Sequence, residues 1–197
     1  MTAHSLRARF KETVSGAILD AAEELAAESG PAGASLQAIA KRAGIAVGTI
    51  YNHFADRNEL FLGLFERRRA ELLADLDAAA KKVAGAPFDK QLLAYVRTVF
   101  TFFDTRRAFL RVALEWHAPK TKNPRESNSL EQLKIRAERI VKIGVKEKRL
   151  KTEGADLFAL FLVAAVRALL ISRADSPKPL ADETESVIAL FMQGAER

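Results

Sequence analysis

Polar side chains able to contact nucleic acid lie close together within residues 47–54. The group consists of Thr49, Tyr51, Asn52 and His53. Ile50 and Phe54 are four residues apart in the same segment, so on a helix both should face inward and leave the polar group mostly on the opposite side. The ring of Tyr51 should lie at the edge against protein, with its hydroxyl free. A short helix of this kind suits contacts with phosphates and base edges.

The surrounding residues predict the elements that position this segment. Ser35 is a suitable N-cap for a helix over residues 35–43, and Gly44 suits a left-handed turn. A second short helix over residues 47–54 follows, and Asp56 is the expected N-cap of a third. Two short helices joined by a glycine-containing turn are typical of a helix-turn-helix, whose second helix enters the major groove of DNA.

The overall charge gives this prediction little support. The chain carries a formal net charge of +6, but residues 1–57 contain six basic and six acidic side chains and are neutral. The whole positive excess therefore lies downstream of the predicted helix-turn-helix. DNA binding must therefore be inferred from where individual charged side chains point, and not from the net charge.

Three stretches of the first 65 residues resemble the tetracycline-repressor (TetR) family of bacterial transcriptional regulators. They read ILDAAEELAAESG, SLQAIAKRAGIAVG and GTIYNHFADRNEL. The resemblance implies a DNA-binding domain of three helices over residues 1–57 and a helical ligand-binding and dimerisation domain over residues 58–197. Carried over by position, the side chains that would contact phosphates or bases are Ser35, Thr49, Tyr51 and His53. Arg57, where the family usually has lysine, would hold a phosphate, and Gly48 would allow close approach to the groove.

Three features set this sequence apart from the family, and one of them is Pro31, which replaces a usual aromatic residue after Gly30. Ala46-Val47 stands where Ser-Lys is common, which removes a hydroxyl and a charge from the reading helix. Val47 can instead contact a thymine methyl group. Asn52 occupies a position that varies in the family, so we expect Val47 and Asn52 to help set the sequence preference.

The rest of the chain predicts an all-α fold of about nine helices. Gly30-Pro31 should end a first helix over residues 7–29, with residues 31–34 as a loop. Beyond Asp56, helices are predicted over residues 56–80, 88–104, 106–117, 126–148, 152–173 and 180–194, with a loop over residues 118–126. The basic runs Arg67-Arg68-Arg69 and residues 134–149 are interpreted as solvated faces, in preference to sites for an anionic partner.

Large apolar residues of the second domain suggest a pocket for a mainly hydrophobic small molecule. The candidates are Phe65, Val96, Phe100, Phe103, Phe109, Leu110, Trp116 and Phe161. The alternative is that these residues only fill the core, and the family resemblance supplies most of the case for a pocket.

Residues 152–173 are apolar nearly all round, so the helix must be buried on several sides. We infer burial against a partner subunit, and the resemblance implies that the last two helices pair with their symmetry mates in a two-fold dimer. The candidate interface residues are Leu162, Val166, Leu169, Val187, Ile188 and Phe191.

Signals for other classes of protein are missing. The chain has no cysteine, its three histidines lack metal-ligand spacing, and no phosphate-binding loop or nucleophile motif occurs. We expect no catalytic residue, no metal and no cofactor. The opening is polar and basic, and the most apolar run is short and contains Arg167, so we expect a cytoplasmic protein without a membrane segment.

These observations predict a dimeric DNA-binding transcriptional regulator, a repressor that a hydrophobic small molecule releases from a near-palindromic operator. Two alternatives stay open. One is a DNA-binding dimer without a small-molecule ligand. The other is a helical small-molecule-binding protein that does not act on DNA.

Overall fold

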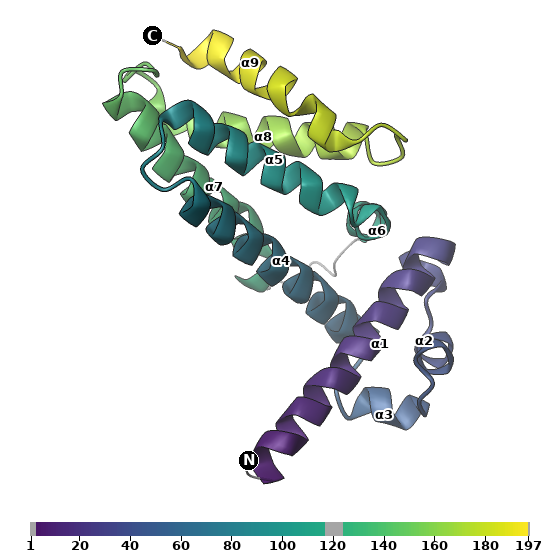
Figure 1. Cartoon of the computed structure of the whole chain (residues 1–197). Helices are drawn as coiled ribbons and strands as arrows, with labels where there is room; N and C mark the ends of the chain where they lie inside the picture. Colours follow the sequence, from purple (N-terminus) through teal and green to yellow (C-terminus); the bar gives the residue numbers. More distant parts are fainter. Residues whose placement is uncertain (1–2, 117–123, 197) are drawn as a thin grey trace. The chain divides into compact units, whose positions relative to one another are not determined.

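The computed structural model describes residues 3–116 and 124–196, with side chains from residue 9 in the first segment and from residue 130 in the second. The elements of the described residues are helices (Figure 1): α1 (Ala3–Gly33), α2 (Leu36–Ala43), α3 (Val47–Tyr51), α4 (Arg57–Lys82), α5 (Phe88–Asp104), α6 (Arg107–Glu115), α7 (Pro124–Lys146), α8 (Ala155–Ser172), the short 3-10 helix η1 (Leu180–Glu183) and α9 (Thr184–Ala195). Leu150 and Glu196 form an isolated antiparallel bridge. The predicted all-α fold is confirmed.

The packing divides the chain into two compact units. The first contains the described residues of Met1–Arg68 and Ala108–Thr121, and the second those of Arg69–Arg107 and Lys122–Arg197. The sequence placed a domain boundary after residue 57. The first unit instead continues through the first turns of α4 and takes in most of α6.

Several helix boundaries differ from the prediction. Gly30 interrupts α1 with φ 72° and ψ 161°, but the helix resumes through Pro31 to Gly33, so residues 31–33 are not a loop. α3 ends at Tyr51, and the N–H groups of His53 and Phe54 close its last turn on the Ile50 carbonyl. α6 covers Arg107–Glu115, and α7 begins at Pro124. The predicted loop over residues 118–126 otherwise lies outside the described residues.

In the first unit, ion pairs fix α1 to α2 and to α4. Arg42 of α2 donates to Glu24 at 3.2 Å and to both carboxylate oxygens of Glu28 at 3.0 and 2.8 Å. This arginine lowers the pKa of the Glu28 carboxyl group, chiefly through the hydrogen bonds. Arg68 of α4 donates to Glu23 at 2.8 Å, and Glu23 is the one charged residue that is buried in the described part of the chain.

The neighbouring Arg67 also binds α1. It donates to the carboxylate of Asp20 at 2.5 Å and to the carbonyl of Gly16 at 3.1 Å. The prediction of a solvated face was therefore wrong for Arg67 and Arg68, because both hold α4 against α1. Their partners lie more than 40 residues away in the sequence.

In the second unit, α5 is the inner helix and packs against α7, α9 and η1 (Figure 1). Its buried side chains are Phe88, Leu92, Tyr95, Val96, Val99, Phe100 and Phe102. Gly144 of α7 lets two of its neighbours approach closely, because a Cβ there would lie 2.8 Å from both Phe88 and Leu150. Arg136 of α7 makes a two-pronged ion pair with Asp77 of α4, at 3.0 and 2.9 Å, so this part of the basic run is also not simply solvated.

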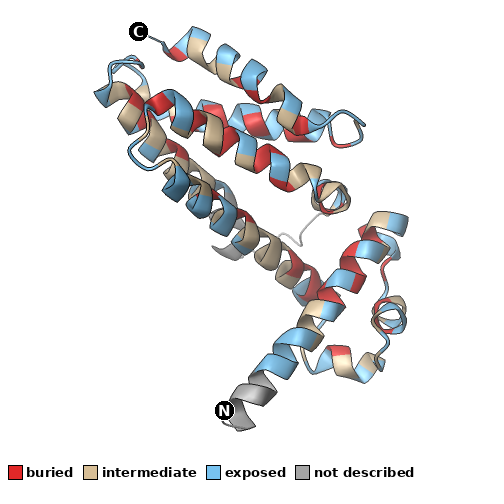
Figure 2. Cartoon of the chain, in the orientation of Figure 1, coloured by how far each residue is buried: buried red, intermediate tan, exposed pale blue. Residues whose placement is uncertain are grey.

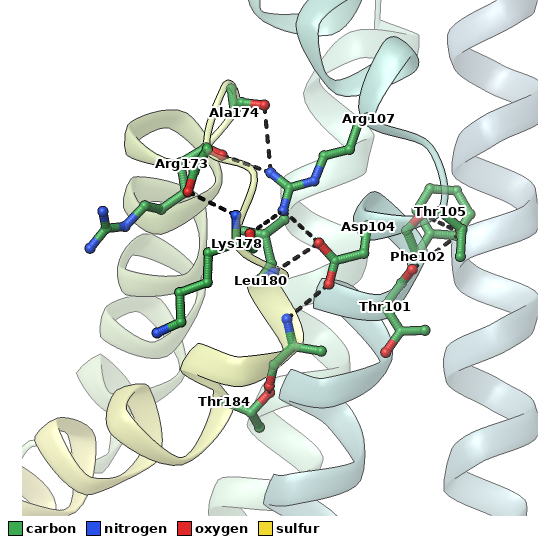
Figure 3. A network of polar contacts seen from close by, with 12 residues as sticks. Thr101, Phe102, Asp104, Thr105, Arg107, Arg173, Ala174, Lys178, Leu180 and Thr184 are labelled. Carbon is green, nitrogen blue, oxygen red and sulfur yellow. Dashed lines mark hydrogen bonds and ion pairs between the residues drawn. The ribbon is translucent and has the colours of Figure 1, made fainter.

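A polar network joins the corner between α5 and α6 to the segment between α8 and η1 (Figure 3). The carboxylate of Asp104 accepts from the backbone N–H groups of Leu180 at 2.8 Å and Ala181 at 2.9 Å, and so caps η1. Arg107 donates to Asp104 at 2.6 Å and to the carbonyl of Arg173, at the end of α8, at 2.7 Å. One ion pair therefore satisfies backbone groups at two helix ends.

The residues of α8 expose an apolar face (Figure 2). Only five of its 18 residues are buried: Ala159, Leu162, Val163, Val166 and Leu170. The large apolar side chains left exposed on α8 and α9 are Leu157, Leu160, Phe161, Ile171 and Leu190, of which Phe161 is 64% and Leu190 69% exposed. A groove beside α7 continues this face, with Leu130 on α7 and Leu160, Ala164 and Ile171 on α8 among its lining residues.

Candidate DNA-binding surface

The turn between α2 and α3 has the predicted local geometry. The Ser35 hydroxyl accepts a hydrogen bond from the Ala38 N–H at 3.2 Å, which caps the first turn of α2. Gly44 has a left-handed backbone, φ 69° and ψ 32°, and ends the helix. Ile39 and Ala40 anchor α2 in the unit's core. The two predictions that rest on Ser35 and Gly44 are confirmed.

α3 presents one polar side and buries the other. Ile50 is fully buried and Phe54 nearly so, while Tyr51 is 55% exposed and Asn52 is also exposed. The predicted contacts Val47, Thr49 and His53 are half-buried at the edges of this surface. We call the solvent-facing side of α3 and the turn after it, with Val47, Gly48, Thr49, Tyr51, Asn52 and His53, the α3 surface.

Two glycines bear on how this surface is held and approached. A Cβ at Gly63 of α4 would lie 3.1 Å from the Phe54 ring, so glycine there lets the end of the helix-turn-helix lie closely against α4. A Cβ at Gly48 would meet nothing within 4 Å. The fold itself therefore does not need glycine at position 48. An external partner that lies close to the backbone would need it.

The start of α4 is fixed by a reciprocal cap. Asp56 accepts from the Glu59 N–H at 2.8 Å, and the Glu59 carboxylate accepts in return from the Ala55 N–H at 2.5 Å. This capping box satisfies two backbone donors at the helix start. The prediction that Asp56 caps the helix is confirmed, and the cap fixes where α4 begins relative to α3.

The side chain of Arg57 points inward, which its predicted phosphate contact did not suggest. Its Nε donates to the Ala34 carbonyl at 3.0 Å. The guanidinium carbon lies 5.2 Å from the ring centroid of Phe61 and 5.7 Å from that of Trp116. The side chain is half-buried, and in this arrangement it is turned inward and is not presented beside the α3 surface.

The pKa of His53 is lowered, first because the imidazole is partly removed from water and second because Lys11 of α1 repels a positive charge there. His53 is therefore neutral at pH 7 in the free protein. A neutral imidazole retains one donor and one acceptor nitrogen. It can donate to a phosphate, and it can gain a proton when a phosphate approaches.

Comparison with known proteins shows what this part of the chain is similar to. The pattern described as "Bacterial regulatory proteins, tetR family" matches residues 18–64, which include the whole of α2, the turn and α3. Residues 18–64 therefore match a domain of the tetR family. A fatty acid metabolism regulator protein of Bacillus subtilis (strain 168) is 35% identical over 79 residues, or 40% of this chain and 39% of that relative. The sequence match thus spans well under half of the length of this Bacillus subtilis relative.

Solved structures of transcriptional regulators share the fold of almost the whole chain. The transcriptional regulator FadR from Bacillus subtilis, solved in complex with stearoyl-CoA, superposes with a TM-score of 0.78 over 90% of this chain and 97% of its own, at 20% identity. FadR from Bacillus halodurans gives 0.79 over 91% and 98%, also at 20% identity. The ketosteroid regulator KstR2 of Mycobacterium tuberculosis gives 0.69 over 93% and 95%, at 19% identity. At these identities the matches establish a shared fold.

The eight residues predicted to line a ligand pocket are divided between the two units. Phe65, Phe109, Leu110 and Trp116 belong to the first unit, in which Phe65 lies 5.8 Å from Phe109 and 6.1 Å from Trp116, centroid to centroid. Val96, Phe100, Phe103 and Phe161 belong to the second. Val96 and Phe100 fill its core, whereas Phe161 faces solvent, so the structure does not bring Phe161 together with them, and its place in a ligand pocket stays a prediction.

The predicted dimer residues are mostly part of the subunit's own core. Leu162, Val166 and Val187 are buried within the chain, and Leu169, Ile188 and Phe191 are half-buried. Phe191 packs edge-on against Phe158 at 6.2 Å. The assignment of Leu162, Val166 and Val187 to a partner contact was wrong, because the apolar residues left unpartnered are those on the opposite side of α8, including Leu157 and Phe161.

Proposed function

We propose that the protein is a dimeric transcriptional repressor that binds DNA through the α3 surface and is released by a hydrophobic small molecule. The observation that carries the DNA-binding role is the exposed polar side of α3, held by the Ser35 cap, the Gly44 turn and the Asp56–Glu59 capping box. These contacts fix the backbone without using the side chains of Tyr51 and Asn52. Those side chains stay available for phosphates and base edges.

We assign the contacts as follows. Ser35, Thr49, Tyr51 and His53 hold phosphates or bases, Gly48 permits close approach, and Val47 and Asn52 set the preferred sequence. A two-fold dimer places one α3 in each of two major-groove segments, so the operator is near-palindromic with half-site centres about 34–36 Å or a multiple of this apart.

The exposed face of α8 supports dimer formation. Leu157, Leu160, Phe161 and Ile171 would be costly to leave in water, and the alanines among them, Ala164 and Ala168, allow a second helix to approach closely. By length and composition α8 is also apolar enough to cross a membrane, with a mean hydropathy of 2.1. A helix packed within a helical domain passes the same test, and pairing with a second copy accounts for the face here.

The comparisons also suggest a chemical class for the small-molecule effector. One structural relative was solved with stearoyl-CoA, and the relative that matches in sequence is a fatty acid metabolism regulator. We therefore propose a long-chain acyl compound as the class of effector. An effector that prefers the arrangement that does not bind DNA needs about 1–3 kcal/mol of coupling to release the operator.

Tyr51→Ala is expected to weaken DNA binding by about tenfold or more, because the hydroxyl and ring contact with the backbone is lost for every sequence. Tyr51→Phe removes only the hydroxyl and should lose less. Asn52→Ala should change which sequence is preferred. Fluorescence anisotropy on specific and scrambled duplexes measures all three, with circular dichroism to check the fold. Undiminished binding by Tyr51→Ala would remove that contact from the assignment.

DNA affinity is expected to rise as the pH falls from about 7.5 to about 5.5, because the phosphate beside His53 favours its charged form and binding takes up a proton. If DNA raises the pKa by one unit, the gain approaches tenfold. His53→Gln should bind with little dependence on pH over the same range. The same pH profile for wild type and His53→Gln would show that His53 does not meet a phosphate.

A further inference from the structure

Two hydrogen-bond donors are buried without an acceptor at the contact between Arg57 and Trp116. They are Nη2 of Arg57 and Nε1 of Trp116, and neither has a partner among the described residues. Both groups are donors only, so neither can satisfy the other. A buried donor without an acceptor is destabilising, and one that belongs to a charged guanidinium is especially so.

Other contacts hold Arg57 inward despite this deficit. Phe61 and Trp116 stack with their ring centroids 4.6 Å apart and an interplanar angle of 18°. The guanidinium lies near both rings, within the distance at which a cation is attracted to an aromatic face. The hydrogen bond to Ala34 adds a link to the residue that precedes the Ser35 cap of α2. Arg57 thus joins the start of α2, the start of α4 and the residue that follows α6.

DNA offers Arg57 a set of partners that this inward position lacks. Arg57 is the first residue of α4, and the chain between it and the exposed Tyr51 and Asn52 is only a short turn. A phosphate can accept from two guanidinium nitrogens at once. Nη2 is shielded from solvent in the inward position, so the guanidinium must leave the Phe61–Trp116 rings before a phosphate can reach that nitrogen and bind both arms of the fork.

We propose that Arg57 alternates between two positions and that the inward one is an autoinhibitory contact. In the inward position it binds the Ala34 carbonyl and the rings of Phe61 and Trp116, and in the outward position it binds a DNA phosphate. The inference rests on the proposed DNA-binding function and adds a regulatory role for Trp116. Because Trp116 stabilises only the inward position, whatever strengthens the Arg57–Trp116 contact weakens DNA binding, and by linkage DNA must loosen the surroundings of Trp116.

The chain contains a single tryptophan, so Trp116 reports on its own surroundings. Wild-type protein is titrated with an operator duplex recovered by selection from genomic fragments, and binding is followed independently by gel shift. The emission of Trp116 is expected to change in intensity and wavelength in step with binding, and its quenching by acrylamide to increase. Arg57→Met, which keeps an apolar stem and loses the charge, should bind DNA more weakly and show no such change.

Trp116→Leu tests the direction of the coupling. It removes the ring that holds Arg57 inward, so DNA affinity is expected to rise about threefold or more. Leu114→Ala, an exposed residue of the same α6, is the matched control and should leave the affinity unchanged. In the Arg57→Met background, Trp116→Leu should give no increase.

The outcomes separate this inference from the proposed function. Saturating binding with unchanged Trp116 emission and quenching would overturn the alternation of Arg57 and leave the DNA-binding role intact. An equal emission change in Arg57→Met would overturn it too. Wild-type protein that binds no duplex at all would overturn the proposed function, and the inference with it.

Discussion

Phe161→Glu is expected to separate the proposed dimer and to remove high-affinity operator binding. Phe161 is 64% exposed in the single chain and lies among the small and apolar residues of the exposed α8 face. In a two-fold dimer each substitution places a carboxylate against an apolar surface, which costs about 3 kcal/mol or more and lowers the association constant by more than ~100-fold. A separated subunit can no longer bind both half-sites of an operator at once, so operator binding should weaken by a similar factor. Sedimentation velocity and anisotropy measure the two effects.

Leu114→Glu is the control for this substitution. Leu114 is also an exposed large apolar residue, at 40%, but it lies on α6 and belongs to neither α8 nor α9. It should leave the sedimentation coefficient of the dimer unchanged. A Phe161→Glu protein that sediments like wild type at micromolar concentration would place the dimer contact elsewhere.

Asp104→Ala is expected to lower the free energy of unfolding by about 2–4 kcal/mol. The carboxylate is only 17% exposed and accepts from two backbone N–H groups and from Arg107. Its removal leaves the donors at the start of η1 without a side-chain acceptor and leaves Arg107 without its anion. The midpoint of urea unfolding, followed by circular dichroism, should fall accordingly.

Asp182→Ala provides the comparison for Asp104→Ala. Asp182 is an exposed acidic residue of η1 itself, beside the capped Ala181. Its replacement removes the same charge without removing the network, so the free energy of unfolding should change by no more than about 0.5 kcal/mol. Equal losses for the two variants would show that the Asp104–Arg107 network contributes little stability.

Local features of the DNA-binding surface could be predicted because neighbouring residues determine them. The Ser35 and Asp56 caps act within three residues, and the left-handed turn at Gly44 depends on one backbone position. The direction of Arg57 could not be predicted in this way. It depends on contacts with Ala34 and with Trp116, which lies 59 positions further along the chain. No local sequence pattern predicts the contact with Trp116.

Pairing at long range also explains the other departures. Arg67 and Arg68 read as part of a basic run, but the acidic side chains that bind them are on α1. The buried residues Leu162 and Val166 of α8 were assigned to the dimer contact for a different reason. α8 is apolar around most of its circumference, so periodicity shows that the helix is buried on several sides without showing which side the subunit itself covers.

Selection of genomic fragments of the source organism by the purified wild-type protein tests most directly whether the α3 surface reads DNA. Retained fragments are expected to share a near-palindromic site with half-site centres about 34–36 Å or a multiple apart, to be released by added salt, and to be lost with Tyr51→Ala. No enrichment of any fragment, even at low salt, would contradict a DNA-reading role for this surface.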